Sequence, residues 1–69
     1  MQKINFTSMR GTELSGFVVA QKRVARRGFI YLVQKCGRIH AVFNGMAVVD
    51  CFEGEVASDE LFKFAEREI

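Results

Sequence analysis

The residues whose types and spacing most suggest chemistry lie in the segment RRGFIYLV, residues 26–33. Two arginines and a glycine precede Phe29 and Tyr31, which are two positions apart. In a β-strand this spacing places both rings on one face, next to positive charge. Single-stranded nucleic acid is bound by such combinations, because bases stack on the rings while cations contact the phosphates. The alternative interpretation is an ordinary strand after a basic turn, with both rings in a core or a dimer interface.

This pattern defines a candidate nucleic-acid-binding set. Two aromatic side chains would stack bases, and four neighbouring cations would contact phosphates. The six candidates are Lys22, Arg23, Arg26, Arg27, Phe29 and Tyr31.

Residues 27–34, RGFIYLVQ, resemble the aromatic strand motif of RNA-recognition domains. Five positions fit that motif, namely Arg27, Gly28, Phe29, Tyr31 and Leu32. The segment from Gly16 to Leu32 is also similar to the start of a cold-shock domain, in which a glycine-led strand runs through a basic turn into a Gly-aromatic pair. These resemblances imply base stacking by the two rings and phosphate contacts by the basic residues. The rest of the chain follows neither family, and we assign it to neither.

Residues suited to catalysis or metal binding are few. His40 is the only histidine, and no Cys-x-x-Cys spacing occurs. Cys51 is expected on the same sheet surface as His40, where the two could form a thiolate–imidazole pair. A structural histidine beside a buried free cysteine is the simpler interpretation. We therefore expect no enzyme activity, no cofactor and no metal site.

The net charge of +2 hides an uneven distribution along the chain. Residues 1–40 carry eight Lys or Arg residues and one Glu, whereas residues 41–69 carry two basic and seven acidic residues. Such an asymmetry favours an anionic partner for the basic half. Alternatively, the two halves face each other, within one chain or across a dimer.

Length and composition predict one small domain that spans residues 1–69. No signal peptide follows Met1, and no apolar run approaches the roughly 20 residues that a membrane span needs. Two cysteines, Cys36 and Cys51, are then expected to be reduced thiols. These features predict a cytoplasmic protein without membrane contact.

Hydrophobic alternation and turn residues predict a small α+β domain, in which a C-terminal helix packs on one face of an antiparallel meander of four to five strands. Asn44-Gly45 is the strongest hairpin signal, and Gly37-Arg38 is read as a second two-residue turn. Ser58 is read as the cap of the helix. The predicted strands are residues 3–9, 17–25, 29–36, 39–43 and 46–52, and the predicted helix is 58–69.

The Asn44-Gly45 turn also predicts which residues face each other across the last hairpin. Ala41 is expected opposite Val48, His40 opposite Val49, and Ile39 opposite Asp50. Both surfaces of the resulting sheet are mainly apolar, and one short helix covers only one of them. The second surface would be covered by closure into a barrel, by a second copy of the chain or by a ligand, and we expect a homodimer.

Two functions remain open from the sequence. The first is a small non-catalytic module that binds RNA or other single strands through the basic turn and the strand aromatics, as a homodimer. The second is a protein-interaction module, an accessory or inhibitory polypeptide that binds another protein through an open apolar sheet face or an edge strand.

Overall fold

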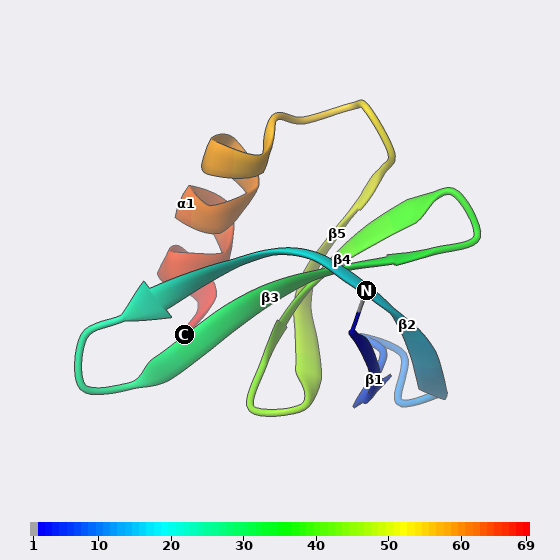
Figure 1. The fold of residues 1–69 in the computed structure, drawn as a ribbon, viewed down its shortest axis with the longest axis horizontal. Helices are drawn as coiled ribbons and strands as arrows, with labels where there is room; N and C mark the ends of the chain where they lie inside the picture. Colours follow the sequence, from blue (N-terminus) through cyan, green and yellow to red (C-terminus); the bar gives the residue numbers. More distant parts are fainter. Residues whose placement is uncertain (1) are drawn as a thin grey trace.

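The computed structural model describes residues 2–69, which form five strands and one helix (Figure 1). The strands follow one another closely along the chain, and the helix comes last. Their bounds are β1 Lys3–Thr7, β2 Glu13–Val24, β3 Gly28–Lys35, β4 Arg38–Phe43, β5 Met46–Phe52 and α1 Ser58–Glu68.

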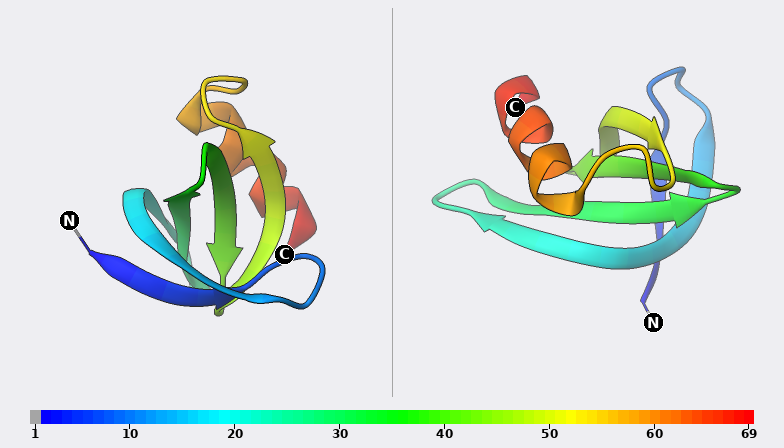
Figure 2. Two further views of the ribbon diagram at one scale, coloured as in Figure 1. Left: turned by 90° about the vertical axis from the view of Figure 1, so that its right-hand side faces the viewer. Right: turned by 90° about the horizontal axis from the view of Figure 1, so that it is seen from above.

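The five strands form an antiparallel meander that closes into a barrel (Figure 2). Each strand pairs with the next, and β1 also pairs with β5 in parallel at Thr7 and Met46. The backbone N–H of Thr7 donates to the carbonyl oxygen of Gly45 at 2.8 Å, which fixes this closure. The predicted α+β class is confirmed. Of the three ways to cover the second sheet surface, closure into a barrel is the one observed.

The second strand makes the barrel possible because it bends. Its first half pairs with β1 and its second half with β3, and a bulge at Val19 separates Val18 from Ala20 in the ladder. A bulge adds twist and lets one strand take part in two differently oriented parts of a sheet. Gly16 is buried at the position where β1, β2 and β3 meet.

Apolar side chains form two clusters, one on each surface of the curled sheet. The outer core packs α1 on the sheet through Ile30, Leu32, Ala41, Leu61, Phe62 and Ala65. The inner core fills the barrel with Phe6, Val33, Val42 and Ala47. Both surfaces are therefore covered within one chain. The homodimer was expected because one apolar surface was left uncovered by the helix, and that reason no longer applies. The homodimer itself stays a prediction. No helix within residues 2–69 has the length and apolar character to span a membrane.

Three local predictions are wrong. Strand β2 begins at Glu13 rather than at residue 17, because Glu13–Phe17 pairs with the whole of β1. The second tight turn is Cys36-Gly37, not Gly37-Arg38: both its residues have positive φ, 51° and 74°, and Lys35 pairs with Arg38. At the start of α1, Ala57 is the N-cap residue and no side chain caps the helix, so Ser58 is its first helical residue.

The predicted pairing of the last hairpin holds only next to its turn. Val42 faces Ala47 and Phe43 faces Met46, as expected. A bulge then leaves Val48 without a partner, so that Ala41 faces Val49. From that point each β5 residue lies on the surface opposite to the one predicted, because side chains alternate along a strand. Asp50 consequently lies across from His40, and Cys51 across from Ile39.

The Asn44-Gly45 turn has φ values of 52° and 79°, which are those of a hairpin turn with two left-handed residues. Replacing Gly45 by valine is expected to lower the free energy of unfolding by about 1 to 3 kcal/mol, because a β-branched residue is strained at positive φ. A Cβ at Gly45 would contact nothing within 4 Å, so strain is the whole effect. Chemical denaturation measures it. The control is Met46→Val, an exposed strand position where valine is favoured; equal destabilisation of both variants would contradict the explanation.

Candidate nucleic-acid interface

The inner surface of the barrel continues along the β2–β3 hairpin from the core into solvent. Val33, Tyr31 and Phe29 lie on this surface, because alternate residues of β3 share a face. Val33 is fully buried in the inner core, Tyr31 is half-buried against that core, and Phe29 is 40% exposed. Along this surface of the hairpin, exposure therefore increases from Val33 through Tyr31 to Phe29.

The two rings are arranged as a stack. Their centroids are 6.1 Å apart and their planes differ by 28°. Tyr31 is fixed by its contact with the inner core, and Phe29 lies on its outward side. A nearly parallel pair with one ring reaching solvent is the kind of platform on which a nucleic-acid base can stack.

One candidate cation lies beside this platform, and a second lies in the turn that follows β2. Arg23 is the cross-strand partner of Phe29, so its side chain starts on the same surface. Arg26 lies in the β2–β3 turn with a φ of 65° and is exposed. Within residues 2–69, neither arginine forms a salt bridge. Both guanidinium groups are available to an anionic partner.

The other two candidate cations are engaged with the helix on the opposite surface. The Lys22 ammonium lies 2.7 Å from a carboxylate oxygen of Glu66. The Arg27 guanidinium donates to the backbone oxygen of Ile69 at 2.9 Å, and it lies 5.7 Å from the centre of the Phe43 ring. The structure thus places Arg23 beside the ring pair and Arg26 in the adjoining turn, whereas Lys22 and Arg27 contact the C-terminal helix region.

The chain fits no protein-family model, and no curated protein or solved structure is significantly similar to it. The resemblance at residues 27–34 consequently assigns no family.

Within residues 2–69, the basic and acidic halves of the chain meet at one salt bridge that involves a Lys or Arg side chain, that between Lys22 and Glu66. The contact of Arg27 with the last residue adds a second tie between the hairpin and the end of α1. Figure 1 shows the hairpin turn close to the C-terminus. These ties orient the hairpin but leave the charge of Arg23 and Arg26 uncompensated, which favours an anionic partner at this end.

A pair of polar side chains that the sequence did not reveal lies inside the barrel. His40 is 4% exposed, and its Nδ1 is 2.7 Å from a carboxylate oxygen of Asp50. The ring also contacts that of Phe6, with centroids 5.0 Å apart. Because a carboxylate only accepts hydrogen bonds, Nδ1 carries the proton, and Nε2 is the nitrogen left for other partners.

The expected proximity of Cys51 to His40 is wrong. The bulge at Val48 places Cys51 on the outer surface, across from Ile39. Burial raises the pKa of the Cys51 thiol, and the negative charges of Glu55 and Asp50 raise it further. The thiol therefore stays protonated at neutral pH, which makes it a poor nucleophile.

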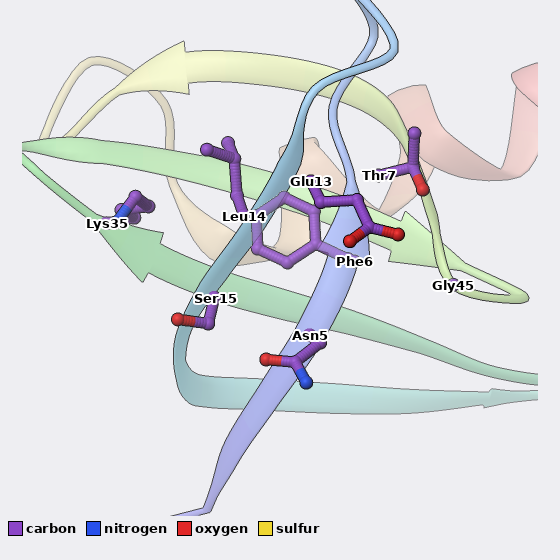
Figure 3. A pocket seen from close by; sticks show the side chains of 8 residues that line it. All are labelled: Asn5, Phe6, Thr7, Glu13, Leu14, Ser15, Lys35 and Gly45. Carbon is purple, nitrogen blue, oxygen red and sulfur yellow. The ribbon is translucent and has the colours of Figure 1, made fainter.

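The remaining surface features do not define a stronger site. Within residues 2–69, no group of three or more His, Cys, Asp or Glu side chains is arranged to hold a metal ion. A cleft of about 540 Å³ lies beside the paired strands β1 and β2. Figure 3 shows the side chains that line it, among them the Phe6 ring. Its charged lining groups are Glu13 and Lys35, which have opposite signs. This cleft indicates no preference for a charged ligand.

Proposed function

We propose that this protein is a small binding module for single-stranded nucleic acid, and that it holds the strand at the open end of the inner barrel surface. The observation that carries the proposal is the exposed Phe29 ring, stacked on Tyr31 and paired across the strands with Arg23. One base would stack on Phe29, and Arg23 and Arg26 would contact the adjacent phosphates. Lys22 and Arg27, which contact the helix, are omitted from this interface.

One copy of the chain supplies both the rings and the cations, so the proposal requires no second copy. The homodimer is tested separately, by sedimentation equilibrium over a wide range of protein concentrations. Self-association through the hairpin would compete with nucleic acid, whereas self-association elsewhere would leave binding unchanged.

The protein-interaction alternative loses one of its two supports, since α1 and barrel closure cover the two sheet surfaces. The edge-strand support remains, because β5 pairs with β1 only at Met46. A pull-down with tagged protein, with and without nuclease treatment, separates the two functions. Co-purified protein that survives nuclease treatment, with no recovered nucleic acid, would favour the alternative.

The phosphate contacts are tested by the double variant Arg23→Gln, Arg26→Gln. We expect weaker binding to a fluorescent single-stranded oligonucleotide. The slope of log affinity against log salt should also become shallower by about 0.7 for each phosphate that the variant no longer neutralises. The control is Lys63→Gln, Arg67→Gln, which removes the same charge from the exposed side of α1. If the control flattens the slope equally, the binding is a response to net charge and involves no site on the hairpin.

Base stacking is tested by Phe29→Ala. The expected decrease in affinity is about 1 to 3 kcal/mol, with an unchanged salt slope, because stacking releases no counterions. Phe64→Ala is a matched control, since Phe64 is also 40% exposed but lies on α1. An unaltered affinity for Phe29→Ala would exclude the ring from the interface. Tyr31→Ala is less suitable, because its contact with the inner core ties it to stability.

A further inference from the structure

The His40–Asp50 pair opens onto a cleft at the end of the barrel remote from the hairpin turn. The cleft has a volume of about 490 Å³, within the range of small-molecule sites. The residues that matter for its chemistry are Met9, Arg10, Leu14, Arg38, His40 and Asp50. They come from the β1–β2 loop, the start of β2 and the two strands of the last hairpin.

His40 has an unused hydrogen-bonding atom in this cleft. Its Nε2 makes no hydrogen bond within residues 2–69. Yet no fully enclosed side-chain nitrogen or oxygen of these residues lacks a partner. Nε2 therefore keeps some contact with solvent, and His40 lines this cleft. A histidine that is 4% exposed, fixed by a carboxylate on one nitrogen and open on the other, is unusual in an otherwise apolar barrel.

Two arginines give the cleft a positive rim. Arg38 lies with its guanidinium 4.5 Å from the centre of the Phe52 ring, which orients it. Arg10 lies in a loop that is held by its own hydrogen bonds: the Ser8 hydroxyl accepts from the backbone N–H groups of Arg10 and Thr12 at 3.2 and 3.1 Å. Neither arginine forms a salt bridge within the described residues.

We infer that this cleft binds a small organic oxyanion. The guanidinium groups of Arg10 and Arg38 hold the anionic oxygens, because their fork of N–H donors matches phosphate and carboxylate geometry. The anion accepts a hydrogen bond from Nε2 of His40 when that nitrogen carries a proton, while Nδ1 donates to Asp50. The apolar body of the ligand packs on Met9 and Leu14. The charged groups that line the cleft together with His40 are Asp50 from β5, Arg38 from β4 and Arg10 from the loop.

The single histidine makes the site directly observable. The ¹⁵N-labelled protein is titrated with phenyl phosphate, benzoate and inorganic phosphate at constant ionic strength, and the His40 ring nitrogens are followed by NMR. We expect a saturable shift of Nε2 toward its protonated value with phenyl phosphate or benzoate, and the stronger of the two identifies the oxyanion. Inorganic phosphate should bind more weakly, since it has no apolar body.

Variants test whether the arginines belong to the site. Arg38→Gln is expected to weaken binding about tenfold, an effect typical of removing a charge-assisted hydrogen bond. Arg10→Gln, in an exposed loop, gives the same test at a position with little role in folding. Arg23→Gln, at the hairpin, is the control and should bind normally. An unmoved His40 signal with all three anions, equal affinity for inorganic phosphate, or equal weakening in the control would each overturn the inference.

Discussion

Replacing Gly16 by alanine is expected to lower the free energy of unfolding by about 3 kcal/mol, at the upper end of the usual cost of overpacking. An added Cβ would lie 2.5 Å from the carbonyl oxygen of Gln34 and 2.8 Å from Cγ1 of Val33. The valine methyl group could turn away, but the carbonyl belongs to the backbone of the neighbouring strand. Relief therefore requires β2 and β3 to separate where they meet β1. For a domain of this size the destabilisation corresponds to a melting temperature lower by roughly 12 to 24 °C.

The control is Gly11→Ala in the β1–β2 loop. A Cβ there would have no atom within 4 Å, but Gly11 has a φ of 85°. Alanine at that position should cost about 1 to 2 kcal/mol through backbone strain alone. Gly16 has no positive φ, so its effect isolates the steric contact. A melting temperature for Gly16→Ala that equals or exceeds that of Gly11→Ala would show that the strands are not held this closely.

The position of Gly16 illustrates what the sequence leaves open. In the chain it ends the segment 11–16, in which two glycines enclose mainly small or polar residues, a composition typical of a loop. The requirement for glycine comes from Gln34, eighteen residues further on, and arises only after β2 has paired with β1 and β3 at once. Local composition contains no trace of such a long-range contact.

The parts of the fold that were predictable depend on local rules. Alternating apolar residues and the Asn44-Gly45 turn predict the last hairpin, and the helical spacing from Leu61 predicts α1. The Cys36-Gly37 turn was predicted one position too late. This error leaves every β3 and β4 side chain on the predicted surface of the sheet, because the predicted and observed registers differ by two residues along the partner strand. Ile30 and Leu32 accordingly share the outer surface with Ala41.

The bulge at Val48 was not predicted, and missing it changes which residue lies beside His40. Without it, Asp50 would lie on the outer surface among the apolar residues that pack against α1, where a carboxylate is costly to bury. The bulge exchanges the two surfaces and gives Asp50 a partner in His40. The sequence does contain a signal for this bulge. Strict alternation fails at Ala47, Val48 and Val49, which are consecutive apolar residues followed by an acidic one.

The candidate interface was predictable in part for a similar reason. Spacing within β3 correctly places Phe29 and Tyr31 on one face, because alternation is a property of a single strand. Judged by charge alone, Lys22 and Arg23 are equivalent candidates for phosphate contacts, and so are Arg26 and Arg27. Adjacent strand residues face opposite sides, however, and Lys22 thereby reaches Glu66 on α1. Selecting the cations that share a surface with the rings requires the register of β2 against β3.

Replacing Leu61 by alanine is expected to lower the free energy of unfolding by about 2 to 5 kcal/mol, the range for buried leucines. Leu61 is 1% exposed and belongs to the outer core beside Phe62 and Ala65. No side chain caps the start of α1, and a helix of 11 residues is marginal alone, so packing on the sheet supplies most of its stability. The truncation leaves a cavity where the helix packs. Chemical denaturation, followed by far-ultraviolet circular dichroism, measures the destabilisation.

Phe64→Ala is the matched variant on the same helix, because its larger side chain is 40% exposed and lies outside the outer core. Its cost should stay below about 1 kcal/mol, as for most surface substitutions. The order of the two effects thus depends on burial and not on the size of the residue removed. A larger destabilisation by Phe64→Ala than by Leu61→Ala would mean that α1 packs through its other side. In that arrangement Glu66 and Ile69 could no longer hold Lys22 and Arg27, and all four hairpin cations would be free to contact an anionic partner.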